Sequence, residues 1–74
     1  MAMKKQKPLP AKQVAILEFV KAYSAEHGYP PTMREIAVGT SISGVSSVRY
    51  NLQLLEARGL VRSTPNQARS ICVL

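Results

Sequence analysis

The segment from Gly28 to Glu35 carries the signals for the end of one helix and the start of another, and it constrains the fold more than any other part of the sequence. Gly28 is suited to a left-handed helix end, and Pro30 and Pro31 prevent a helix from continuing through them. Thr32 and Glu35 have the spacing of a capping box, in which both side chains satisfy free backbone N–H groups of a first helical turn. Two helices are therefore predicted to meet here at a sharp break.

Apolar residues at helical spacing predict the two flanking helices. In residues 11–27, positions i, i+3, i+4 and i+7 form one apolar stripe. The members of this stripe are Ile16, Phe19, Val20 and Tyr23. After the capping box, Ile36 and Ala37 supply the inward face of a two-turn helix that cannot continue far past Gly39. A turn with one apolar plug, Ile42, is predicted to follow.

A third helix is predicted from the apolar positions after this turn. They recur at intervals of three and four residues, and they are Val45, Val48, Leu52 and Leu55. Arg58 and Gly59 supply a cation and a helix-ending glycine. Two short runs with β-branched residues, 60–63 and 70–73, then flank a turn that contains Pro65 and Asn66. These runs predict a β-hairpin.

The order helix, helix, turn, helix, hairpin is typical of a winged helix-turn-helix fold. We therefore expect a mainly α fold with a small β-hairpin, formed by one domain over residues 9–74. The helix-turn-helix is predicted at about 33–53 and the wing at about 60–74. Residues 1–8 contain three lysines and no apolar pattern, and we interpret them as a flexible basic tail. A solvated end and a DNA-contacting arm are equally compatible with that tail.

The composition narrows the choice of partners. The chain has 74 residues and a formal net charge of +6, so polyanions are the expected partners. Cys72 and His27 are single residues of their kinds and cannot assemble a zinc site, so we expect no metal and no cofactor. Cys72 is interpreted as a packed small apolar residue, and no nucleophile–base pair or phosphate loop indicates an enzyme. Because no membrane span or secretion signal is apparent, the expected location is the cytoplasm.

The third predicted helix has a polar face turned away from its apolar stripe. This face consists of Ser46, Arg49, Tyr50 and Gln53, with Ser47 at its margin. In a major groove, Arg49 is suited to guanine O6 and N7, and Gln53 is suited to adenine. Tyr50 is suited to a thymine methyl group or a phosphate, and the serines are small enough to permit close approach. The alternative is an ordinary solvated helix surface.

Phosphate contacts are predicted from two other places. Arg62 and Arg69 lie on the hairpin, beside the third helix in this fold. Thr32 and Arg34 lie at the start of the second helix, where free backbone N–H groups favour an anion. Capping alone is the alternative role for Thr32, and the two roles are compatible.

Residues 28–37, which read GYPPTMREIA, resemble the G-x-P-P-T/S-x-R/A-E-I stretch of the DNA-binding domain of the LexA repressors. The resemblance continues through Ser46, Ser47, Val48 and Leu52 into residues 55–62. Residues 69–71 resemble the wing strand of that family. The resemblance covers about residues 9–74.

This resemblance implies that the third helix reads operator bases while the hairpin touches the DNA backbone. The family's reading positions correspond to Gly44, Ser46, Ser47, Arg49 and Tyr50. It further implies a transcriptional repressor of DNA-damage (SOS) genes that blocks polymerase as half of a dimer on a palindromic operator. Two segments depart from the family's pattern. In residues 38–42 the family usually has a Gly-Leu or Gly-Phe pair before a serine, and residues 49–51 differ from the usual reading residues. The operator is therefore expected to differ.

The family continues beyond this region into a hinge with a self-cleavage site and a Ser-Lys peptidase domain that also dimerises. The 74-residue chain is therefore expected to perform no self-cleavage, to be a monomer in solution and to pair only on DNA. An excised domain and a naturally short relative are both compatible with the sequence.

Two other functions fit the same sequence. Winged helices also serve as protein-docking modules, whose affinity for a partner would change little between about 50 and 200 mM salt. DNA binding through about five phosphates would fall more than a hundredfold over that range. Non-specific binding of nucleic acid through net charge would show no preference among duplexes and would depend on residues 1–7.

Overall fold

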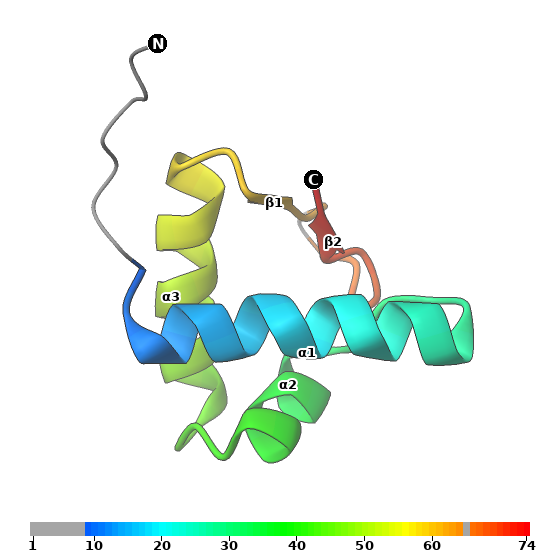
Figure 1. Cartoon of the computed structure of the whole chain (residues 1–74), viewed down its shortest axis with the longest axis horizontal. Helices are drawn as coiled ribbons and strands as arrows, with labels where there is room; N and C mark the ends of the chain where they lie inside the picture. Colours follow the sequence, from blue (N-terminus) through cyan, green and yellow to red (C-terminus); the bar gives the residue numbers. More distant parts are fainter. Residues whose placement is uncertain (1–8, 65) are drawn as a thin grey trace, which may run out of the picture.

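The computed structural model describes residues 9–64 and 66–74, which form three helices and a small antiparallel sheet (Figure 1). The helices are α1 (Ala11–His27), α2 (Met33–Thr40) and α3 (Val45–Ala57). The strands are β1 (Val61–Arg62) and β2 (Cys72–Val73). The predicted mainly α fold with a hairpin is confirmed, and the arrangement is a winged helix-turn-helix. The predicted tail, residues 1–8, lies outside the described residues.

The break between α1 and α2 is formed by the predicted residues. Gly28 ends α1 in the left-handed region with a φ of 80°, and its N–H donates to the Ser24 carbonyl oxygen at 2.9 Å. At the start of α2, the Glu35 N–H donates to Thr32 Oγ1 at 3.1 Å. The Thr32 N–H donates in return to Glu35 Oε1 at 2.9 Å. The capping box is therefore confirmed with both of its hydrogen bonds.

The core lies where the three helices and the hairpin meet. Its buried apolar side chains are Ile16, Val20, Ile36, Ile42, Val48, Leu52, Leu55, Val61 and Ile71. The predicted plug, Ile42, is among them. Phe19, Tyr23 and Val45 were predicted on buried stripes but are only half-buried. In Figure 1 the last turns of α1 project beyond the place where α2 and α3 cross it.

A buried pair of amide side chains joins α1 to α3. Gln13 Nε2 donates to Asn51 Oδ1 at 3.2 Å, and Asn51 Nδ2 donates to the Ser47 carbonyl oxygen at 2.9 Å. Both side chains are almost fully buried, so each amide needs partners inside the protein. These directional bonds fix the rotation of α3 about its own axis relative to α1.

Gly39 allows α1 and α2 to approach closely. A Cβ atom at this position would lie 2.1 Å from Cε1 of Phe19 on α1. No carbon pair tolerates that separation, so any side chain at position 39 would displace the Phe19 ring. The glycine therefore lets the Phe19 ring keep its position against α2, although glycine weakens a helix interior.

The hairpin is shorter than predicted. Val61 pairs with Val73 and Arg62 pairs with Cys72, so each strand has two residues. The pairing stops after Arg62 because side chains accept the next N–H groups. Ser63 donates to Glu56 Oε2 at 3.3 Å, and Thr64 donates to Ser70 Oγ at 2.8 Å.

Cys72 was predicted to be packed, and this is wrong, because its side chain is exposed. Ile71, directly before β2, enters the core, and the next side chain, that of Cys72, points outward. In the described part of the chain, no helix has both the length and the apolar character needed to span a membrane.

Candidate nucleic-acid interface

The turn between α2 and α3 sets the start of α3. Ser41 follows α2 in the left-handed region with a φ of 60°, and its N–H donates to the Val38 carbonyl oxygen. Ile42 then enters the core and anchors the turn. Gly44 precedes α3 with a φ of 87°, a conformation that favours glycine, and nothing would contact a Cβ atom there. The start of α3 is therefore open to an approaching ligand.

The predicted polar face of α3 is accessible. Ser46, Arg49, Tyr50 and Gln53 are exposed, and Ser47 is half-buried. Tyr50 has 62% of its surface exposed, which is high for an aromatic side chain in a small domain. The opposite face of α3 is held in the core. The helix thus presents hydrogen-bonding side chains on a rigid support, as recognition by a helix in the major groove requires.

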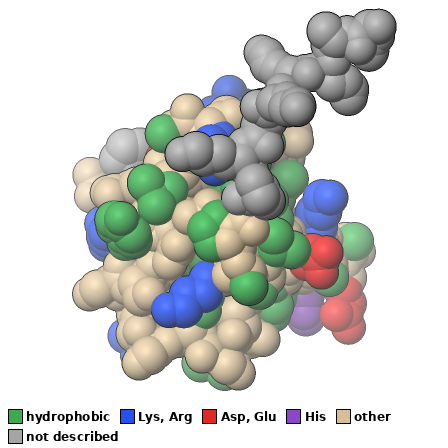
Figure 2. All heavy atoms as spheres, turned by 60° about the vertical axis from the view of Figure 1, so that its left-hand side comes forward, with side chains coloured by type: hydrophobic (Ala, Val, Ile, Leu, Met, Phe, Trp, Pro, Cys, Tyr) green, Lys and Arg blue, Asp and Glu red, His purple; other side chains and the backbone are tan. Residues whose placement is uncertain are grey.

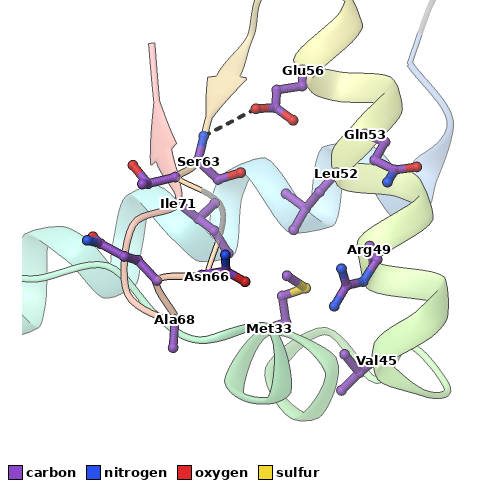
Figure 3. Close-up of a pocket in the computed structure, with 12 residues that line it drawn as sticks. Met33, Val45, Arg49, Leu52, Gln53, Glu56, Ser63, Asn66, Ala68 and Ile71 are labelled. Atoms are coloured by element: carbon purple, nitrogen blue, oxygen red, sulfur yellow. Dashed lines mark hydrogen bonds between the residues drawn. The ribbon is translucent and has the colours of Figure 1, made fainter.

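A groove of about 560 Å³ runs between α3 and the wing (Figure 3). Arg49 and Gln53 border it from α3, and Asn66 and Gln67 border it from the wing. Figure 3 shows Met33, in the first turn of α2, at its base, with Arg49 extending from α3 toward it. The groove therefore combines one cation and several amide groups, which are suited to phosphates and base edges, with one carboxylate, Glu56, which accepts the Ser63 N–H.

Exposed cations lie on each of the elements that meet at this groove. Arg34 on α2, Arg49 on α3 and Arg62 on β1 are all exposed. On the face shown in Figure 2, Lys and Arg side chains are spread over the surface, while the acidic side chains in view gather at one edge beside the histidine. A face of this kind attracts a polyanion.

Thr32 and Arg69, two predicted phosphate contacts, are engaged within the protein. The Thr32 hydroxyl accepts the capping hydrogen bond described above. Arg69 points to Glu35, with Nη1 at 2.9 Å from Oε1 and Nη2 at 2.8 Å from Oε2. These bonds, and then the Thr32 N–H, lower the pKa of Glu35 to about 2, so the carboxylate is ionised at physiological pH.

The pairing of Arg69 with Glu35 was not predicted, because 34 residues separate them and no periodic pattern links the wing to α2. The remaining predicted residues occupy the expected surfaces, on α3, on the first turn of α2 and on β1. A short capped helix, a tight turn, an exposed polar helix and a basic wing together define a winged helix-turn-helix domain of the DNA-binding class.

Comparison with known proteins identifies the family. Residues 6–70 match the family described as LexA DNA binding domain, and the chain belongs to this family. It is 42% identical over 73 residues to the LexA repressor of Clavibacter sepedonicus, covering 99% of the chain and 32% of that protein. For the LexA repressor of Roseiflexus sp. (strain RS-1), identity is 44% over 69 residues, covering 93% of the chain and 32% of that protein.

The LexA repressor of Caldicellulosiruptor saccharolyticus is 45% identical over 69 residues, covering 93% of the chain and 33% of that protein. The chain thus spans about a third of the length of the curated relatives it matches. The matched family is described by DNA binding, and the relatives themselves are named as repressors.

Proposed function

We propose that the chain binds double-stranded DNA at a specific operator, with α3 in the major groove, and thereby represses transcription. The observation that carries the proposal is the exposed polar face of α3 beside a groove bordered by the wing. B-form DNA admits one helix of this kind, and the wing then lies where the DNA backbone passes.

Base contacts are assigned to the exposed face of α3. Arg49 is proposed to bond guanine O6 and N7, and Gln53 to bond adenine. Ser46 and Ser47 bond base edges or phosphates at close range, and Tyr50 packs against a thymine methyl group. The absent side chain of Gly44 lets the DNA approach the start of the helix.

Phosphate contacts are assigned to the first turn of α2 and to the wing. Arg34 is exposed in the first turn of α2, and its guanidinium is proposed to bond a phosphate, while Glu35 itself occupies the N-terminal N–H of Thr32. Arg62 projects from β1 on the exposed side of the hairpin. Because these residues border α3 from two sides, they orient it in the groove without reading sequence.

We further propose that the operator is palindromic and that two copies of the chain pair only on it. A stable protein interface buries about 800 Å² per partner. The exposed large apolar side chains are instead distributed over all three helices, the loop after α1 and the last residue. Sedimentation at micromolar concentration should therefore show a monomer, and a stable dimer would contradict this proposal.

Selection of bound sequences from a random duplex library, at about 150 mM salt, tests the function. The wild type is expected to enrich a short palindromic motif. Arg49→Ala is expected to lose about 1–3 kcal/mol of binding free energy and to relax the preference at one position of each half-site. The expected loss is confined to that position because a guanine contact is specific to one base pair.

Arg62→Ala is the matched control, because it removes the same group from a proposed phosphate contact. It should weaken binding to all sequences alike and leave the selected motif unchanged. No enrichment by the wild type would contradict sequence reading and favour a docking module or a charge-driven binder.

A further inference from the structure

The Arg69 guanidinium makes more contacts with the rest of the domain than a free surface cation would. Besides its two bonds to Glu35, its Nη1 lies 3.0 Å from the Pro30 carbonyl oxygen and 3.4 Å from the Tyr23 hydroxyl oxygen. The carbon at its centre lies 4.8 Å from the centroid of the Tyr29 ring. One wing side chain therefore contacts α1, the loop after α1 and the first turn of α2.

An aromatic cluster supports this arrangement. The Tyr23 ring lies 4.1 Å from the His27 ring and 6.0 Å from the Tyr29 ring, measured between centroids. The rings are tilted against one another, and the face of the Tyr29 ring lies against the guanidinium that the Glu35 carboxylate also bonds. The end of α1 thus helps to form a receptor for Arg69.

This environment opposes a phosphate contact by Arg69. A phosphate at the remaining N–H groups of the guanidinium would lie beside a carboxylate that is already bonded at 2.8 and 2.9 Å. The same carboxylate is also held by the Thr32 N–H, and its negative charge would repel the phosphate. Arg62, which is exposed on β1, forms no ion pair with a carboxylate among the described residues.

We propose that Arg69 is a positioning residue, which fixes the wing on the first turn of α2 and makes no phosphate contact itself. The consequence for DNA binding rests on the proposed function above. Arg69 follows the wing turn that contains Asn66 and Gln67, so its attachment sets the distance of these amides from Arg49 across the groove. If the wing were released from α2, Asn66 and Gln67 would no longer be held at a fixed distance from Arg49.

The free protein provides the first test, which does not depend on DNA. Backbone ¹⁵N relaxation is measured for Gln67 and Ser70 in the wild type, Arg69→Lys and Glu35→Gln. Lysine keeps the charge but lacks the planar fork, and glutamine keeps an oxygen for the Thr32 N–H. Both variants are expected to lower the order parameter at these amides from about 0.85 toward about 0.6, while amides of α3 remain unchanged.

Binding to the selected duplex provides the second test, measured as a function of salt. Arg69→Lys and Glu35→Gln are each expected to weaken binding about fivefold without changing the salt dependence. Arg62→Gln, which removes a proposed phosphate contact, should reduce the slope of log affinity against log salt by about 0.9. Lys21→Gln, on the exposed side of α1, controls for the loss of one charge and should leave affinity unchanged.

Combining Arg69→Lys with Glu35→Gln should weaken binding no further than either change alone, because both break the same attachment. The proposal is overturned if Arg69→Lys binds like the wild type, if Glu35→Gln binds more tightly, or if the wing amides stay rigid in both variants. If the wild type binds no duplex, the proposed function is contradicted. The relaxation data would then test the positioning role of Arg69 by themselves.

Discussion

Raising the salt concentration from about 50 to 200 mM is expected to weaken binding to the selected duplex by roughly 500-fold. Each neutralised phosphate contributes about 0.9 to the slope of log affinity against log salt, and we expect about five such contacts. Arg34 and Arg62 supply two of them through exposed guanidinium groups. Fluorescence anisotropy titrations of a labelled duplex at four salt concentrations would measure the slope.

Measuring the salt dependence on both the selected duplex and a scrambled duplex distinguishes the three candidate functions. A docking module would show a slope near zero for its protein partner, because few counterions are released. A charge-driven binder would show the same affinity and slope on any duplex. Sequence-specific binding predicts a steep slope together with a difference of about 10³-fold or more between the selected duplex and a scrambled one.

Gly39→Ala is expected to lower the free energy of unfolding by about 1–3 kcal/mol. The added methyl group would meet the Phe19 ring at 2.1 Å, so α2 or the ring must move. Helix propensity works in the opposite direction, since alanine is favoured over glycine by about 1 kcal/mol in a helix interior. Urea denaturation followed by circular dichroism would show which effect is larger.

A second substitution separates the clash from other causes. In a Phe19→Leu background the ring is gone, and Gly39→Ala should then become neutral or stabilising, because only the helix propensity remains. If Gly39→Ala raises the urea midpoint of unfolding in the wild-type background, the Phe19 ring moves aside without cost, and the prediction is wrong.

Local signals made much of the fold predictable. The capping box at Thr32 and Glu35 and the stop at Gly28 depend on neighbouring residues, and the structure has both where they were predicted. The accessible face of α3 follows from helical geometry once the buried stripe is known. For the same reason, the accessibility of Arg49 and Gln53 could be predicted, whereas their contacts with bases stay a prediction.

Contacts between distant segments were not predictable in this way. Gln13 and Asn51 are 38 residues apart, and each looks like an ordinary surface amide in the sequence. The pairing of Arg69 with Glu35 has the same character. Opposite charges that meet only after folding have no fixed spacing in the sequence. Arg69 was therefore interpreted as a phosphate contact from its charge alone. The outward direction of Cys72 was missed because a two-residue strand is too short to show alternation.

The amide pair between Gln13 and Asn51 has a consequence for changing the operator preference of this domain. It holds α3 through side chains that lie on the buried side of the helix, opposite Arg49, Tyr50 and Gln53. The groups that orient the helix and the groups available to DNA are therefore physically separate. We therefore expect that residues of the exposed face can be exchanged as a set while α3 keeps its orientation relative to α1.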